Sequence, residues 1–91
     1  MNDPWHRIEG SVRGPDDQPV AEAFVSIAKA SVVLPEIVQM ATRDGTFAMM
    51  LPAGEFTLKA WSADGALTGE QRFQVPRDLH PRIVLHPAPS S

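Results

Sequence analysis

The three histidines, His6, His80 and His86, are the side chains best suited to bind a transition metal or to transfer protons. His6 lies near the start of the chain and the other two lie near its end, so they meet only if the first and last strands are neighbours. The chain has no cysteine, which excludes thiolate metal sites, cysteine nucleophiles and disulfides. The interpretation we favour is three solvent-exposed histidines at strand edges, with no metal site.

A second candidate is the pair Asp16-Asp17, because two carboxylates in one loop suit a hard cation such as calcium. No further oxygen ligands follow at fixed spacing, so aspartates that cap a turn are the favoured interpretation. Serine, histidine and aspartate are all present, but no serine lies in a Gly-x-Ser-x-Gly motif. We therefore predict no catalytic residue, no metal and no cofactor, and we do not expect an enzyme.

The length of 91 residues sets a ceiling of one domain with one small core. Eight Lys and Arg oppose eleven Asp and Glu, and the basic residues are dispersed, so nucleic-acid binding is not expected. The longest near-apolar stretch, residues 31–41, is too short for a membrane span and contains Pro35 and Glu36. The first residues lack the apolar centre of a signal peptide, which predicts a cytoplasmic protein if Met1 is the native start.

The elements that must position these residues are short strands, because prolines and glycines stand between runs of alternating apolar and polar residues. The expected strands are 5–13, 23–30, 37–43, 46–51, 55–63, 67–75 and 82–86. Asp44-Gly45 and Asp64-Gly65 are hairpin signals between such runs. Together they predict an all-β protein of about seven strands in an antiparallel β-sandwich.

Alternation also predicts which side chains form the core. The inward set includes Val25, Ile27, Phe47, Met49, Phe56, Leu58, Ile83 and Leu85. Residues 31–36 are compatible with a strand end, an apolar loop or the end of a short helix over 26–34. We expect one domain over residues 1–87 and a flexible tail over 88–91.

Four segments stand in a distinctive order and spacing. They are Ile8-Glu9-Gly10-Ser11-Val12, then Pro19-Val20 with Ala23-Phe24-Val25, then Thr42-Arg43-Asp44-Gly45-Thr46-Phe47, then Leu51-Pro52-Ala53-Gly54-Glu55-Phe56-Thr57-Leu58. They resemble carboxypeptidase regulatory-like domains, which are transthyretin-like (prealbumin-like) modules, over about residues 6–86. The resemblance implies a Greek-key, transthyretin-like β-sandwich and a mostly non-catalytic folding, spacing or docking unit. Gln18 departs from the family, which usually has Gly before the Pro-Val step.

The transthyretin-like superfold also includes hydrolases of 5-hydroxyisourate. Those enzymes resemble one another in an N-terminal His motif, an inward Arg and a C-terminal Tyr-Arg-Gly-Ser ending. This chain has no tyrosine and ends in His86-Pro87-Ala88-Pro89-Ser90-Ser91, so that activity is not expected.

The outward positions of the expected strands include Phe24, Met50 and Trp61, which we predict as binding residues. Several exposed apolar side chains on neighbouring strands form a patch that is unusual in a monomer, and Trp is enriched at binding hot spots. Strand register decides whether another set joins them, namely Val38, Met40 and Val84. The competing interpretation is that loops or a tail cover these side chains.

The predicted function is a non-catalytic protein-binding or assembly module. It would act through an outer sheet face or a free strand edge, on a protein partner or on a second copy of itself. The alternative is a carbohydrate- or peptide-ligand-binding module, although two Trp and four Phe leave few aromatic residues for stacking on a sugar. The third interpretation is an enzyme of unrecognised type.

Overall fold

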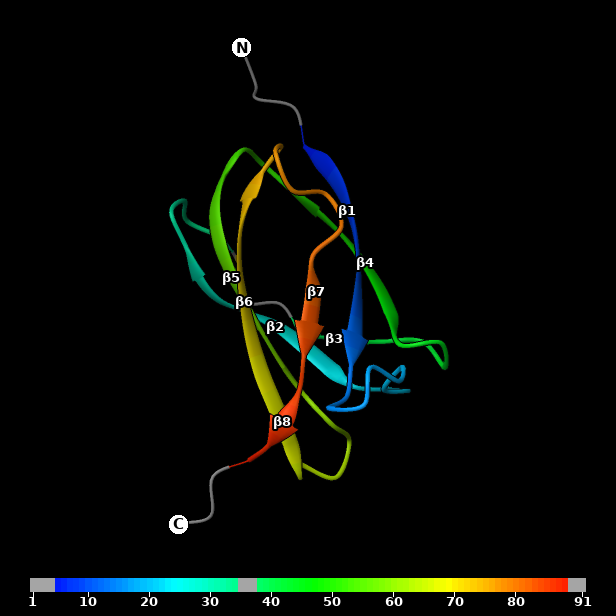
Figure 1. Cartoon of the computed structure of the whole chain (residues 1–91). Coiled ribbons are helices and arrows are strands. Elements are labelled where there is room, and N and C mark those ends of the chain that lie inside the picture. Colours follow the sequence, from blue (N-terminus) through cyan, green and yellow to red (C-terminus); the bar gives the residue numbers. More distant parts are fainter. Residues whose placement is uncertain (1–4, 35–37, 89–91) are drawn as a thin grey trace.

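In a computed structural model the chain forms β-strands and no helix over the residues described, which are 5–34 and 38–88 (Figure 1). The strands are β1 (His6–Arg13), β2 (Phe24–Ala30), β3 (Val38–Met40), β4 (Thr46–Leu51), β5 (Gly54–Trp61), β6 (Leu67–Val75), β7 (Arg82–Val84) and β8 (His86–Pro87). They form a three-stranded sheet, ordered β4-β1-β7, and a five-stranded sheet, ordered β3-β2-β5-β6-β8. The all-β prediction is confirmed, and no helix over the described residues is suited to cross a membrane.

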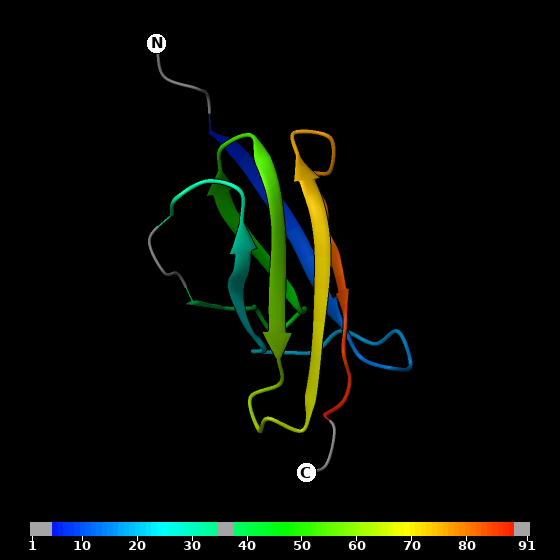
Figure 2. The same cartoon turned by 90° about the vertical axis from the view of Figure 1, so that its left-hand side faces the viewer.

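The two sheets contribute to one apolar core, and Figure 2 shows the five-stranded sheet in front of the three-stranded one. The buried residues occupy alternate positions along each strand, as β-pleating requires. In β5, Phe56, Leu58 and Ala60 are buried while the intervening Thr57 and Lys59 are not. The inward prediction is confirmed for seven of the eight named residues, and Ile27 is only partly buried.

Among the described strands, β5 and β6 form the longest pairing. It extends from Gly54 opposite Val75 to Trp61 opposite Thr68. The turn that closes it contains Gly65 with φ of 78°, a left-handed conformation that glycine adopts without steric cost. The hairpin predicted at Asp64-Gly65 is confirmed.

The second predicted hairpin, at Asp44-Gly45, is wrong. The turn itself is present, with the Gly45 N–H donating to the Thr42 carbonyl at 3.0 Å, but its two flanking strands belong to different sheets. β3 pairs with β2, whereas β4 pairs with β1, so the turn connects the two sheets. The strand predicted over 37–43 is also shorter, since β3 ends at Met40 and the buried Ala41 donates to the Ala23 carbonyl at 2.7 Å. Ile37 lies outside the described residues.

The strand predicted over 82–86 is two strands that belong to different sheets. β7 runs parallel to β1, and β8 runs antiparallel to β6. Between them the fully buried Leu85 donates its N–H to the Arg13 carbonyl at 2.7 Å. Over residues 5–34 and 38–88 the fold therefore has eight strands and one parallel pairing, where about seven antiparallel strands were expected. The Ala88 N–H donates to the Ala66 carbonyl at 2.8 Å, and the rest of the predicted tail, residues 89–91, lies outside the described part.

Two segments left open by the sequence take definite conformations. Residues 31–34 are not helical, and Ser31 continues alongside β5 by accepting from the Glu55 N–H at its hydroxyl and donating its own N–H to the Glu55 carbonyl, both at 2.9 Å. Residues 35–37 lie outside the described part.

In the first turn, Asp17 adopts φ of 60°, and aspartate is one of the residues that tolerate this conformation. Gly14 closes this turn by donating to the Gln18 carbonyl at 2.8 Å.

The crossing of the C-terminal segment over β6 depends on Gly69. A Cβ at this position would overlap the Val84 carbonyl, which is backbone, and would lie 3.2 Å from Leu85 Cδ2. We expect Gly69→Ala to lower the free energy of unfolding by about 1–3 kcal/mol in urea denaturation. Gly14→Ala is the matched control, because its nearest atom would be 3.6 Å away, and it should change stability by less than about 1 kcal/mol. Equal stabilities of the two variants would contradict this packing.

Candidate functional site

A single row of residues crosses the five-stranded sheet at the level of Trp61. Strand register places Met40 opposite Phe24, Phe24 opposite Trp61, Trp61 opposite Thr68, and Thr68 opposite His86. Residues directly opposite each other share one face of a sheet. Since Val25 and Ala60 point into the core, this row lies on the outer face.

The apolar half of this row is a small cluster next to the sheet edge. The Phe24 and Trp61 rings stack with centroids 5.8 Å apart and planes 27° apart, and both side chains are half-buried. Met40 is 58% exposed beside them, and Val38, two residues away on β3, is 55% exposed. We call these four residues, Val38, Met40, Phe24 and Trp61, the outer apolar patch.

Polar side chains on β2, β5 and β6 border the outer apolar patch. Ser26, Lys59 and Thr68 line a shallow depression of about 490 Å³ together with Trp61, and the strands that supply them face the viewer in Figure 2. The Thr68 hydroxyl donates to the Ala60 carbonyl at 3.4 Å. The indole therefore lies between an apolar neighbour and a set of hydrogen-bonding side chains.

The turn that follows Trp61 is fixed by a compact hydrogen-bond network. The Asp64 carboxylate accepts from the Ser62 hydroxyl at 2.7 Å and from the Ala66 N–H at 2.9 Å. The Ser62 hydroxyl in turn accepts from the Leu67 N–H at 3.0 Å, and Ser62 is buried. The Ala66 N–H, and then the Ser62 hydroxyl, hold the pKa of Asp64 below its usual value. This network anchors the end of β5 at which Trp61 lies.

A second carboxylate with a lowered pKa lies beyond the other end of β6. The pKa of Asp78 is lowered first by the Gln74 N–H, which donates to it at 3.0 Å, and then by Arg77, also at 3.0 Å. Asp78 belongs to the loop between β6 and β7 and lies away from the outer apolar patch. Its hydrogen bonds fix that loop.

The structure brings together two of the three predicted binding residues. Phe24 and Trp61 are in contact, but Met50 lies on β4 of the three-stranded sheet, where it is 48% exposed opposite Arg7. Val84 also belongs to that sheet. The three predicted residues therefore do not form one surface. Sequence analysis did not select Ser26, Lys59 and Thr68, which only strand register brings next to Trp61.

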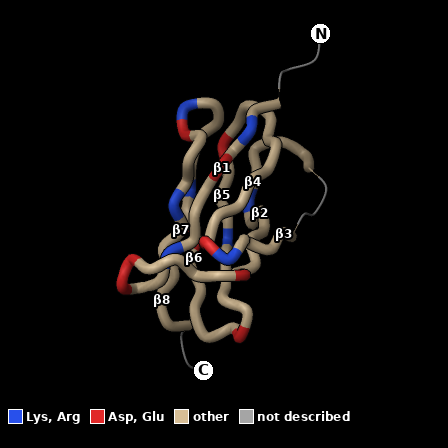
Figure 3. Tube along the Cα trace, turned by 90° about the vertical axis from the view of Figure 1, so that its right-hand side faces the viewer, with Lys and Arg blue, Asp and Glu red and all other residues tan. Residues whose placement is uncertain are grey.

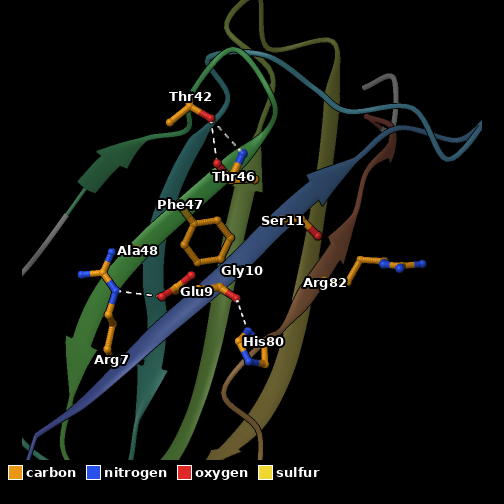
Figure 4. A pocket seen from close by; sticks show the side chains of 10 residues that line it. All are labelled: Arg7, Glu9, Gly10, Ser11, Thr42, Thr46, Phe47, Ala48, His80 and Arg82. Carbon is orange, nitrogen blue, oxygen red and sulfur yellow. Dashed lines mark hydrogen bonds and ion pairs between the residues drawn. The ribbon is translucent and has the colours of Figure 1, made fainter.

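The outer face of the three-stranded sheet instead has a polar groove of about 570 Å³ (Figure 4). Its charged groups are exposed and already paired. Arg7 Nε lies 2.9 Å from Glu9 Oε1, His80 Nδ1 lies 3.1 Å from the Glu9 carbonyl, and Arg82 lies 3.8 Å from Asp17. Each arginine of the groove therefore faces a carboxylate that offsets its charge. Exposed ion pairs of this kind contribute only about 0–1 kcal/mol to stability.

The histidines and the Asp16-Asp17 pair are dispersed over different elements. His6 is on β1, His80 precedes β7 and His86 is on β8. Across residues 5–34 and 38–88, no three His, Cys, Asp or Glu side chains gather as a candidate metal site.

Comparison with known proteins adds no relative. No protein-family model matches the chain, and no curated protein matches it either. The arguments for function therefore rest on the residues and their geometry.

The Asp64 network gives a stability that depends on pH. Because the folded-state pKa of Asp64 lies below the unfolded value of about 3.9, ionised Asp64 stabilises the fold above that pH and loses this effect as pH falls through the folded pKa. We expect wild type to be more stable than Asp64→Asn at neutral pH, with the difference shrinking towards pH of about 3. Urea denaturation across that range measures it, and a difference independent of pH would contradict the assignment.

Proposed function

We propose that this protein is a non-catalytic protein-binding or assembly module that binds a protein partner through the outer apolar patch. The observation on which the proposal rests is the stacked Phe24–Trp61 pair, with the exposed side chains of Met40 and Val38 beside it. Covering such side chains with a partner removes apolar surface from water, which favours association by about 25 cal/mol per Å².

The geometry of the patch supports this use. Stacking against Phe24 restricts the Trp61 ring before any partner binds, so less side-chain entropy is lost on association. The patch begins at β3, the edge strand of its sheet, where a partner can approach without displacing another strand. Ser26, Lys59 and Thr68 provide a polar rim, and an apolar centre with a polar rim is the usual anatomy of a protein interface.

We further propose that the fold is a Greek-key, transthyretin-like β-sandwich of the carboxypeptidase regulatory-like kind. The shared core between the two sheets supports a sandwich. The segments that carry the resemblance fall on β1, β2, β4 and β5 and on the turns before them. Gly45, with φ of 72°, is in the left-handed conformation that the turn glycine of the resembling segment is expected to adopt.

The second candidate function is binding of a carbohydrate ligand at the depression beside Trp61. An aromatic ring next to the hydroxyls of Ser26 and Thr68 and the ammonium of Lys59 is a combination suited to stacking on a sugar and hydrogen bonding to it. Protein binding is favoured because the apolar side chains extend to Met40 and Val38, beyond the reach of a single sugar ring.

The proposal predicts which face of the molecule a partner covers. In quantitative affinity capture from native lysate, Trp61→Ala and Met40→Ala should each reduce capture of a partner by about tenfold or more. Met40 is 58% exposed and lies outside the buried core, so Met40→Ala should leave the fold intact. Met50→Ala is the matched control on the other sheet and should capture as wild type does.

Circular dichroism and thermal melts show whether each variant is folded. Equal capture by all variants, or a loss only with Met50→Ala, would overturn the choice of the outer apolar patch. Capture abolished by a soluble monosaccharide, with saturable binding of that sugar, would favour the carbohydrate interpretation.

A further inference from the structure

The β4 strand is the longest edge strand in the described part of the molecule. The other strands at sheet ends, β3, β7 and β8, have three residues or fewer, whereas β4 has six. The β4 sequence is Thr-Phe-Ala-Met-Met-Leu, with no charge and no proline, and its trace is drawn without blue or red in Figure 3. Edge strands are usually protected from pairing by shortness, charge or proline, and β4 has none of these.

The direction of the backbone groups of β4 follows from its pairing with β1. Val12 donates its N–H to the Gly45 carbonyl at 2.7 Å, whereas Ser11 and Glu9 donate towards Pro81 and Leu79 on the other side. Backbone groups alternate along an antiparallel strand. Phe47, Met49 and Leu51 therefore hydrogen-bond to β1, and Thr46, Ala48 and Met50 direct their N–H and carbonyl groups to the open edge.

The open part of this edge is short and has defined ends. The Thr46 carbonyl accepts from the Thr42 N–H at 2.9 Å, and the Thr46 N–H donates to the Thr42 hydroxyl at 3.3 Å, so Thr46 is already satisfied. At the other end Pro52 has no N–H to donate. Ala48 and Met50 remain, and neither is paired with a strand other than β1 in the described part of the chain.

We infer that two copies of this chain associate by pairing their β4 strands antiparallel, in a register centred on Met49. In this register Ala48 of each copy lies opposite Met50 of the other, and the pair exchanges about four backbone hydrogen bonds. Pairing ends beyond these residues, because Thr42 already occupies the place beside Thr46 and the chain of the other copy must turn away at Pro52. Each backbone N–H and carbonyl left free on Ala48 and Met50 then has a partner on the other copy. This complete pairing is the reason for proposing a second copy rather than an unrelated strand. The inference concerns the three-stranded sheet and does not rest on the proposed function.

The side chains of β4 agree with this register. Met50, which is 48% exposed, would lie across Ala48 of the second copy, so that a long side chain covers a small one. No charge on β4 opposes the approach of an identical strand. The product is a continuous six-stranded sheet about a two-fold axis, which is the commonest symmetry of dimers. Because so few residues take part, the dimer should be weak and should depend on protein concentration.

Sedimentation velocity over about a hundredfold range of protein concentration tests the association. Wild type should shift from monomer towards dimer as concentration rises. Ala48→Lys should weaken the dimer by about tenfold or more, because it places like charges beside the two-fold axis. Val84→Lys is the matched control, since it adds the same charge at an exposed position of β7, the opposite edge of the same sheet, and should dimerise as wild type does. Wild type that stays monomeric throughout, or equal loss in both variants, would overturn the inference.

Single introduced cysteines test the register, because the chain has no cysteine of its own. Ala48→Cys and Met50→Cys chains, mixed and oxidised by dissolved oxygen, should form a disulfide-linked mixed dimer, since these positions lie directly opposite in the inferred register. Each variant alone should cross-link more slowly, because its own thiols are offset by two residues. Faster linkage of Ala48→Cys with itself would place the two-fold axis elsewhere and overturn the register centred on Met49.

Discussion

The arrangement of this protein depends on one segment that hydrogen-bonds to both sheets. Over a few residues the chain pairs with β1 as β7, buries Leu85 completely and then pairs with β6 as β8. Since β1 is central in one sheet and β6 is next to the edge of the other, this crossing holds the two sheets together along one side of the core. Gly69 is required there because the Val84 carbonyl occupies the space of a side chain.

Once the sheets are held in this way, their outer faces have different chemistry. The five-stranded sheet presents the outer apolar patch, with few charges next to the stacked rings. The three-stranded sheet presents a polar groove whose arginines and carboxylates are already paired with each other. An apolar face gains free energy when a partner covers it, whereas an exposed, paired polar face gains little. This difference favours a binding role on the five-stranded sheet over chemistry in the groove.

The sequence predicts most of the strands and the direction of nearly every core side chain, because alternation is a local property of each strand. It does not predict which sheet a strand joins. Asp44-Gly45 is as strong a turn signal as Asp64-Gly65, but only the second closes a hairpin, since β3 and Ala41 bond to β2 and Ala23 and so belong to the other sheet from β4. The prediction that Met50 and Trp61 share one surface failed in the same way. Both side chains point outward, and only the long-range pairing of β4 and β5 shows that they belong to different sheets.

Sheet membership also separates the two kinds of association proposed for this protein. The outer apolar patch is on a sheet face and would bind through side chains, whereas β4 is a sheet edge and would bind through backbone groups. The two elements belong to different sheets, so pairing of β4 leaves Phe24 and Trp61 uncovered. A dimer formed in this way would present two outer apolar patches, and two linked weak sites bind a repeated or dimeric partner more tightly than one site alone. Weak edge pairing would then matter for function by making partner binding bivalent.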